Sequence, residues 1–521
     1  MAVGEERRGK TRRAKAGKVY LVGAGPGGAE YLTLRAQQLL AQATVVIYDA
    51  LADQELLRLT EPGCLHLDVG KRGGEESAAQ AEINQLLVSH CQTGAQVVRL
   101  KSGDPFIFGR AVPEVQVLVE AGCAFEVVPG ISSALAAPLF AGLPLTEQHS
   151  SRCFAVLSGH DLELLPWSAL AQLDTLAILM GTRQLAEITA RLVASGRVAS
   201  TPVAIVRWGG RPQQQVWTGT LADIAEQTKG IQLSPAVIVV GEVVKYRQWL
   251  RWYDARPLSG KTVLVTRSVE QSGQFTELLR EQGARVVEMP ALVIGPPSDE
   301  CQALDQAIAE LASFQWLILT STNAVEVFFE RLAICGLDAR ALAGLKIAVV
   351  GRKTAQSLRA WNLNPDFVPP DFVADSLVEH FPEANLQGVR LLFPRVESGG
   401  RDALVAGFRQ RGADVVEVAG YQSSCPDQAE PQAVAALQAG EVNFVTFASS
   451  KTVRNFVKLL SPHNWQPWLQ AVTIASIGPQ TSQTCIELLG RVDLEATEYT
   501  LEGLTEVIVA GASEPRSEAH A

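Results

Sequence analysis

Hydrophobic residues in the first half of the chain fall into short runs, rich in β-branched residues, that alternate with longer helical stretches. Each run is bounded by glycine or proline turns. Such an alternation is typical of α/β layering, so we predict an α/β fold. Between residues 18 and 244 the runs are KVYLVGAG, ATVVIYDA, AQVVRL, AFEVVPG, DTLAILM, PVAIVRW and PAVIVVGEVV.

This alternation stops at residues 246–260, YRQWLRWYDARPLSG, where aromatic residues and a proline precede a fresh strand at Lys261. We therefore expect a linker at 246–260 between a domain at 18–245 and another at 261–511. Seven of the first 18 residues are Lys or Arg and no apolar stretch accompanies them, so residues 1–17 are interpreted as a disordered basic tail. Residues 512–521 are predicted to form a solvated tail.

The second half contains an internal repeat. TVLVTR, ending at Arg267, matches RLLFPR, ending at Arg395, 128 positions later. WLILTSTNAVEVFFERL matches FVTFASSKTVRNFVKLL, and IAVVGRKTAQS matches IASIGPQTSQT, at nearly the same offset and in the same order. Each copy is too long for a solenoid unit. We therefore expect two similar α/β lobes that face each other across a cleft.

Composition narrows the possible partners. The net charge of −10 argues against general nucleic-acid binding, so an anionic ligand would have to be held by locally placed Arg and Lys. The eight cysteines show neither C-x-x-C nor zinc-ligand spacing, which indicates a reducing cytoplasmic location and no metal. The uncharged stretch Val127–Leu145 contains three prolines and two glycines, so we expect a buried loop and helix there and no membrane span.

The segment Gly23–Gly28 fits G-x-G-x-x-G between a strand and a helix, and Asp49 ends the next strand. One interpretation is a nicotinamide-dependent oxidoreductase, in which Asp49 would bind the ribose. The structural alternative is a tight strand-to-helix turn. Pro26 counts against the first interpretation, because it removes an amide that would hold a pyrophosphate.

The segment RLKSGDPFIFGR, at residues 99–110, favours a different interpretation from a nicotinamide site. It occurs together with six further motifs: GAGPG, YDAL, GKRGG, VPGISSALAAPLFAGLPLT, LMGT and SPAVIVVGEVV. In this order the motifs cover residues 18–245 and resemble the uroporphyrinogen-III C-methyltransferases. The resemblance implies a two-lobed tetrapyrrole methyltransferase fold that holds S-adenosylmethionine between its lobes, usually as a homodimer. It also implies two methylations of uroporphyrinogen III, which yield precorrin-2 for sirohaem or cobalamin.

The same resemblance implies residue roles. Asp49 would be the proton acceptor, because the alkylated macrocycle must lose a proton, and Lys71 the proton donor. Because the substrate is a polycarboxylate, Arg72, Lys101 and Arg110 are candidate clamps beside Lys71. Carried over by motif, the residues of the cofactor site are Pro26, Ser102, Gly103, Asp104, Ile107, Ser132, Ser133, Met180 and Gly209.

Structural alternatives exist for several of these residues. Asp49 and Asp104 are also suited to forming turns, Lys71 and Arg72 to a solvated loop, and Met180 to filling a core. The chain departs from the family's pattern at four places. In chain order the family has Asp, His, Gly-Gly-Glu and His-Arg at these places. Whether these changes impair double methylation stays open. The departures are Gly28, Glu76, Ala111-Val112-Pro113 and Glu147-Gln148.

In the second half, Ser/Thr-rich turns precede four predicted helices, at 320–322, 351–354, 449–450 and 478–481. Exposed helix N-termini attract anions, although ordinary N-capping is the alternative at any single turn. Cations accompany these turns or the strand ends, which suits a polycarboxylate in the cleft. They are Arg267, Arg352, Lys353, Arg395 and Lys451.

No Ser/His/Asp set, metal cluster or P-loop is evident from 261 to 511, and this half resembles the uroporphyrinogen-III synthases. The resemblance implies two flavodoxin-like lobes, about 261–296 with 427–510 and about 299–424, joined by two crossing strands. It also implies cyclisation of hydroxymethylbilane with inversion of the last ring and loss of water. By motif, Tyr421 would assist departure of the hydroxyl, unless its ring only packs in a strand. The matching cleft positions are Ser321, Ser449, Lys451, Gly478 and Thr481.

The two resemblances support each other, because the product of the second half is the substrate of the first. We therefore expect a bifunctional enzyme of tetrapyrrole biosynthesis, and substrate hand-off between its sites is a hypothesis. Two alternatives stay open at this point. The first half would be a nicotinamide-dependent oxidoreductase, or the second half would bind a tetrapyrrole without catalysis.

Overall fold

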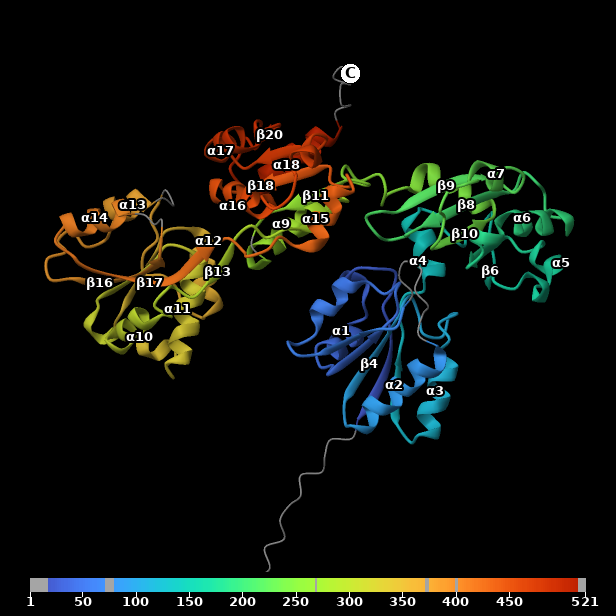
Figure 1. The fold of residues 1–521 in the computed structure, drawn as a ribbon, viewed down its shortest axis with the longest axis horizontal. Helices are drawn as coiled ribbons and strands as arrows, with labels where there is room; N and C mark the ends of the chain where they lie inside the picture. Colours follow the sequence, from blue (N-terminus) through green and yellow to red (C-terminus); the bar gives the residue numbers. More distant parts are fainter. Residues whose placement is uncertain (1–16, 71–78, 268, 371–373, 399–401, 514–521) are drawn as a thin grey trace, which may run out of the picture. The chain divides into compact units, whose positions relative to one another are not determined.

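The computed structural model describes residues 17–70, 79–267, 269–370, 374–398 and 402–513 (Figure 1). They form two compact units that divide near Lys261. The first contains residues 17–261 together with 280–285, and the second contains the rest. The α/β class is confirmed, and each of the seven strands expected in the first half is present.

The first sheet of the first unit is fully parallel, in the order β3-β2-β4-β1-β5. Its central strands are buried on both faces. Val98 and Leu100 pack beside helix α1 (Leu34–Leu40), whereas Val97 packs beside α2 (Gln80–Gln92) and α3 (Ala111–Glu120), on the other side in Figure 1. The strands are β1 (Lys18–Gly23), β2 (Val45–Tyr48), β3 (Leu65–Asp68), β4 (Gln96–Lys101) and β5 (Ala124–Val128).

Three glycines meet where β1, β4 and β5 end. A Cβ atom on Gly130 would lie 2.2 Å from the carbonyl oxygen of Gly103, and one on Gly23 would lie 2.6 Å from the Cα of Gly130. Only residues without a side chain permit this approach. The glycine motifs of the sequence therefore join three loops at the carboxyl edge of the sheet, where open α/β sheets bind ligands.

The second sheet of this unit is mixed, in the order β6-β7-β10-β8-β9. Helix α4 (Ser133–Phe140) packs Ala137 against one face, and α6 (Leu185–Ala194) packs Ile188 on the other. The remaining elements are β6 (Phe154–Ser158), β7 (Thr175–Leu179), β8 (Pro202–Arg207), β9 (Gln215–Thr220), β10 (Ala236–Val240), α5 (Trp167–Leu170), α7 (Ile224–Gln227) and α8 (Arg247–Leu250).

The stretch Val127–Leu145 forms the end of β5, a loop and α4, as expected. Ser132 caps α4 by accepting a hydrogen bond from the Ala134 amide at 3.3 Å. Among the residues that the structure describes, no helix has the length and apolar character that a membrane crossing requires.

The second unit contains two five-stranded sheets, in the orders β12-β11-β18-β19-β20 and β13-β17-β16-β14-β15. The first consists of β11 (Thr262–Val265), β12 (Arg285–Glu288), β18 (Phe444–Phe447), β19 (Thr473–Ser476) and β20 (Leu494–Glu495). The second consists of β13 (Val293–Gly295), β14 (Trp316–Leu319), β15 (Lys346–Val349), β16 (Arg390–Val396) and β17 (Asp414–Ser424).

The sequence repeat explains this pairing. The first strands of one copy, β11 and β12, join β18 and β19 of the other copy, and β16 and β17 join β14 and β15 in the same order. The repeated Phe328 and Phe456 are both fully buried. The helices are α9 (Val269–Glu281), α10 (Gln302–Ala309), α11 (Thr322–Ile334), α12 (Arg352–Ala360), α13 (Ala374–Glu379), α14 (Asp402–Gln410), α15 (Pro431–Gln438), α16 (Ser450–Leu460), α17 (Pro479–Leu489) and α18 (Leu501–Ser513).

Candidate functional site

A cavity of about 210 Å³ lies in the first unit, between loops of its two sheets. Its wall is mixed: Leu51, Val206 and Trp208 are apolar, and two serines supply hydroxyls. Five of the nine residues expected at the cofactor line it, namely Pro26, Ser102, Ser133, Met180 and Gly209.

The other four expected cofactor residues belong to the same loops but do not line the cavity. The Asp104 carboxylate accepts hydrogen bonds from the amides of Phe106 at 2.8 Å and Gly130 at 3.1 Å, so it fastens two loops together. Ser132 caps α4, Gly103 makes the close approach to Gly130, and Ile107 is 42% exposed. Contact between these residues and a cofactor stays a prediction.

Met180 is not a core residue, which was the structural alternative. Its side chain is 50% exposed at the cavity, and its φ of 57° lies in the left-handed region that few non-glycine residues adopt. Trp208, also in the cavity wall, has a φ of 52°. Backbone strain of this kind gathers at functional sites because the surrounding fold must hold it.

Arg211, which sequence reasoning missed, also lines the cavity. Its Nη2 donates to the carbonyl oxygen of Leu51 at 2.8 Å and its Nε to that of Pro26 at 3.4 Å, while its guanidinium lies over the ring of Trp208. A Cβ atom on Gly27 would lie 3.1 Å from Arg211 Cγ, so the glycine motif leaves room for this side chain. The separation of more than 180 residues hid the contact from the sequence.

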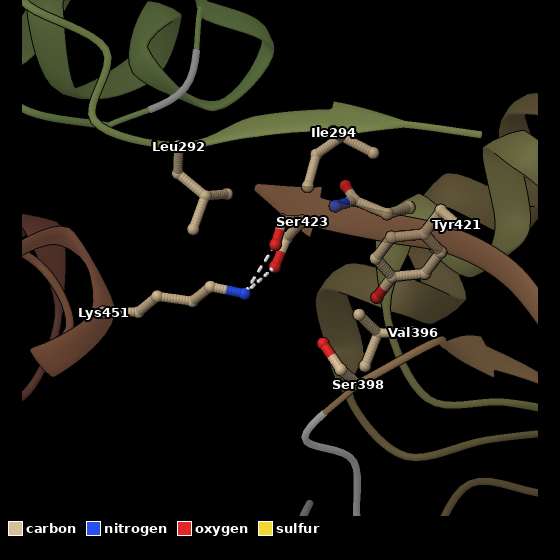
Figure 2. A pocket seen from close by; sticks show the side chains of 8 residues that line it. Leu292, Ile294, Val396, Ser398, Tyr421, Ser423 and Lys451 are labelled. Carbon is tan, nitrogen blue, oxygen red and sulfur yellow. Dashed lines mark hydrogen bonds between the residues drawn. The ribbon is translucent and has the colours of Figure 1, made fainter. Parts of the chain in front are cut away.

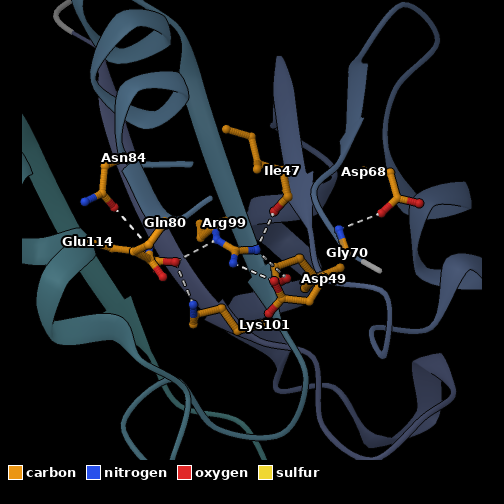
Figure 3. A network of polar contacts seen from close by, with 10 residues as sticks. Ile47, Asp49, Asp68, Gly70, Gln80, Asn84, Arg99, Lys101 and Glu114 are labelled. Carbon is orange, nitrogen blue, oxygen red and sulfur yellow. Dashed lines mark hydrogen bonds and ion pairs between the residues drawn. The ribbon is translucent and has the colours of Figure 1, made fainter. Parts of the chain in front are cut away.

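Asp49 follows β2 at the same edge of the first sheet, and its side chain is 33% exposed. Its Oδ1 accepts a hydrogen bond from Arg99 Nη2 at 2.5 Å. Asp49 is thus the ion-pair partner of Arg99 at the sheet edge (Figure 3).

The expected role of Lys101 as a substrate clamp is wrong for this structure. Its side chain is 3% exposed, and its Nζ lies 2.8 Å from Glu114 Oε1, which is fully buried. Burial and the neighbouring Arg99 lower the pKa of Lys101, although Glu114 and Asp49 oppose the shift. The sequence concealed this, because the strand position alone does not reveal a buried carboxylate on α3.

Of the other residues of the first unit expected to hold the substrate's carboxylates, the structure describes only Arg110. Arg110 is exposed and stands just before α3, at its N-cap, with a φ of 52°. Lys71, Arg72 and the divergent Glu76 lie outside the described residues. Their roles stay predictions.

A second pocket, of about 440 Å³, lies in the second unit (Figure 2). The phenol of Tyr421 lines it from β17 and is 8% exposed. Its oxygen lies 3.1 Å from the Ser321 hydroxyl, which also caps α11 by accepting from the Ala324 amide at 3.1 Å. The lining residues are Leu292, Ile294, Asn323, Val396, Ser398, Tyr421, Ser423 and Lys451.

Lys451 reaches across this pocket from α16 to β17 (Figure 2). Its Nζ donates to the carbonyl oxygen of Ser423 at 2.6 Å and to the Ser423 hydroxyl at 2.5 Å. Both of these partners are uncharged, so the Lys451 side chain can still pair with an anionic group. Ser423, Asn323 and Ser398 were missed, because single polar residues carry no motif.

The remaining expected residues do not line the pocket. Ser449 caps α16 through the Thr452 amide at 3.3 Å, and Gly478 and Thr481 stand at the start of α17. Thr481 is 5% exposed, and a Cβ atom on Gly478 would lie 2.9 Å from the ring of Tyr499. The Ser449 bond fits the N-capping alternative, whereas α17 has no side-chain cap at Gly478. Contact of these three residues with substrate stays a prediction.

The structure also describes the surroundings of the two expected arginines, Arg395 and Arg267. Arg395 is 14% exposed and its Nη1 lies 2.6 Å from Glu417 Oε2, so the adjacent strand already engages its charge. It is not an open cation of the pocket, contrary to expectation. Arg267 follows β11, and burial lowers the pKa of its guanidinium.

Comparison with known proteins matches each unit to a family. The model of tetrapyrrole (corrin/porphyrin) methylases matches residues 18–225, and that of uroporphyrinogen-III synthase HemD matches residues 273–506. The uroporphyrinogen-III C-methyltransferase of Synechococcus elongatus is 55% identical over 237 residues, 46% of this chain and 98% of that protein. The uroporphyrinogen-III synthase of the same organism is 52% identical over 252 residues, 48% of this chain and 94% of that protein.

One relative spans both units. The porphyrin biosynthesis protein HemD of Ruminiclostridium josui is 34% identical over 474 residues, which cover 90% of this chain and 93% of that protein. The nicotinamide interpretation of Gly23–Gly28 is therefore set aside. The chain belongs to the uroporphyrinogen-III C-methyltransferase family in its first unit and to the uroporphyrinogen-III synthase family in its second, and it is a bifunctional enzyme.

Proposed function

We propose that the second unit cyclises hydroxymethylbilane to uroporphyrinogen III, and that the first unit methylates this product twice to precorrin-2. The observation that carries the proposal is the presence, in one chain, of a distinct pocket in each of two units whose families handle the same macrocycle. S-adenosylmethionine is the proposed methyl donor, as the sequence motifs imply.

The cavity of the first unit suits this donor. Its apolar wall, with Leu51 and Met180, fits an uncharged ring and an aliphatic chain, and Ser102 and Ser133 offer hydroxyls to the polar ends. S-adenosylmethionine supplies an electrophilic methyl group, so the protein's task is mainly alignment. Asp49, whose Oδ1 pairs with Arg99, is the proposed base that removes the proton after alkylation.

The pocket of the second unit supplies groups for the cyclisation. The Tyr421 hydroxyl, paired with Ser321, is the proposed donor to the departing hydroxyl of the linear substrate. The Lys451 ammonium is the proposed partner of a substrate carboxylate. This assignment also explains why a tyrosine hydroxyl lies at the pocket instead of a purely apolar ring.

Further features belong to the proposal. The domain limits at 18–245 and 261–511, with the linker at 246–260, await limited proteolysis. A homodimer formed through the first unit awaits light scattering at several protein concentrations. The proposed cytoplasmic location rests on the spacing of the eight cysteines.

One experiment tests the function. The full-length protein is incubated with hydroxymethylbilane, with and without S-adenosylmethionine, and the oxidised pigments are analysed by isomer separation and mass. We expect type III uroporphyrin without the donor and a species heavier by two methyl groups with it. Type I isomer alone contradicts the synthase role, because spontaneous closure gives that isomer. Unmethylated type III product in both arms contradicts the methyltransferase role.

A further inference from the structure

A cluster of four charged side chains lies beneath the carboxyl edge of the first sheet (Figure 3). Arg99 and Lys101 on β4 are 2% and 3% exposed, and Glu114 on α3 is fully buried, whereas Asp49 is 33% exposed. Buried ion pairs cost desolvation energy and seldom stabilise more than an apolar replacement. Stability alone therefore does not explain why a central strand carries this cluster, and a role in the reaction is the alternative.

The contacts within the cluster hold the guanidinium of Arg99 on several sides. Arg99 Nη2 donates to Asp49 Oδ1 at 2.5 Å, and its Nε donates to Glu114 Oε1 at 3.1 Å. Its Nη1 lies 3.4 Å from the carbonyl oxygens of Ile47 and Leu100. The guanidinium is thus held by the end of the neighbouring strand β2, by the backbone of its own strand β4 and by α3, and it has little freedom to rotate.

Glu114 and Lys101 support this arrangement. Glu114 Oε1 accepts from both Arg99 and Lys101, the latter at 2.8 Å, so one carboxylate joins two cations of the same strand. The cluster thus pairs two basic side chains, Arg99 and Lys101, with two acidic ones, Asp49 and Glu114. The partly exposed Asp49 is the end of the cluster that can meet a substrate.

We propose that Arg99 is a positioning residue for Asp49, fixing the orientation of its carboxylate, and that Glu114 and Lys101 hold Arg99 in place. The inference rests on the proposed role of Asp49 as the proton acceptor. Because Arg99 binds Oδ1, Oδ2 is the oxygen that takes the proton from the alkylated macrocycle. Misplacement of a reacting group by about 1 Å costs on the order of a hundredfold in rate.

A double-mutant cycle on the full-length protein tests this inference. The rates of uroporphyrinogen III methylation are compared for wild type, Asp49→Asn, Arg99→Met and the double variant. We expect kcat to fall on the order of a hundredfold in each single variant, with KM for both substrates within about twofold. The double variant is expected to be no slower than Asp49→Asn, because Arg99 acts only through Asp49.

Controls separate positioning from a structural role. Arg191→Met removes a surface arginine that pairs with Glu163 and Glu187 in the same unit, and we expect it to leave kcat unchanged. Affinity for S-adenosylhomocysteine and the cyclisation rate of the second unit report on folding of each variant. If Arg99→Met does not fold, Arg99→Lys takes its place in the cycle, since it keeps the charge and loses the fork.

The outcomes decide the inference. The inference is overturned if the losses in kcat of the two single variants multiply in the double variant. It is also overturned if Arg99→Met leaves kcat unchanged, and in both cases the proposed function stands. A raised KM with an unchanged kcat also overturns it, because that result assigns Arg99 to binding. A wild-type kcat in Asp49→Asn instead overturns the proposed role of Asp49, on which the inference rests.

Discussion

Glu147 occupies one of the positions at which the chain departs from its methyltransferase relatives. Its Oε2 accepts hydrogen bonds from the amides of His149 and Ser150, both at 2.9 Å, from the Ser150 hydroxyl at 3.0 Å and from the Tyr246 hydroxyl at 2.9 Å. These bonds, the His149 amide first, lower the pKa of Glu147 to about 2. The Glu147 carboxylate therefore holds its own loop together and joins it to Tyr246, which lies far away in the sequence. Glutamate at this position thus has a structural role.

The lowered pKa predicts an acid-dependent stability that glutamine lacks. Ionised Glu147 stabilises the fold fully above its ordinary pKa of 4.5, and this contribution is lost as the pH falls from 4.5 through about 2. We expect Glu147→Gln to lower the melting temperature at pH 7, and the difference from wild type to shrink below pH 4.5. Calorimetry at pH 7, 4 and 3 measures it. A constant difference across this range contradicts the prediction.

The variant Tyr421→Phe separates a chemical role of the hydroxyl from packing of the ring, because phenylalanine keeps the ring and removes only the hydroxyl. We expect Tyr421→Phe to slow formation of the type III isomer on the order of a hundredfold, since the proposed proton donor is lost. Methylation of supplied uroporphyrinogen III by the same protein serves as the control and is expected to keep its rate. An unchanged cyclisation rate would show that the ring alone matters.

At the level of elements, strand prediction in the first unit failed only at the edges of its sheets. β3, β6 and β9 were not expected, and each is an edge strand with mostly exposed or half-exposed residues. An edge strand needs no continuous apolar run, because one side faces solvent. The buried strands were predictable, since parallel strands covered on both faces consist of uninterrupted apolar residues.

The close approach of three strand ends gives an element-level prediction. Gly130→Ala would place a methyl group 2.2 Å from the carbonyl oxygen of Gly103, which must then move together with the loop that carries Ser102. We expect affinity for S-adenosylhomocysteine to fall on the order of tenfold or more, since the cavity wall shifts. Titration calorimetry measures it.

The matched control is Gly273→Ala in α9, where an added Cβ atom meets no atom within 4 Å. Alanine favours a helix over glycine by about 1 kcal/mol, so this variant should keep both activities and its affinity. Equal affinities of Gly130→Ala and wild type would show that the loop tolerates the added methyl group.

At the scale of the whole molecule, each unit contains all the lining residues of its own pocket. Two inactive chains should therefore complement each other in solution. We expect a mixture of Asp49→Asn and Tyr421→Phe proteins to convert hydroxymethylbilane to precorrin-2, whereas each alone does so far more slowly. Failure of the mixture would mean that the intermediate passes only within one chain, as the hand-off hypothesis holds.

The sequence by itself determined the buried strands, the repeat in the second half and the loops around both pockets. Those features depend on local periodicity, on glycine at close approaches and on motifs of contiguous residues. The family resemblance carried by those motifs implied Pro26, Ser102, Met180, Tyr421 and Lys451, and each lines a pocket.

The tertiary structure alone decided which charges are available to a ligand. Lys101 is neutralised by Glu114 and Arg395 by Glu417, while Arg211 crosses to Pro26 and Leu51. Such contacts join residues on different elements, so they depend on how strands are ordered and helices packed. A cation's role follows from its neighbours in space, because a buried charge must find a partner there, and local sequence does not encode that partner.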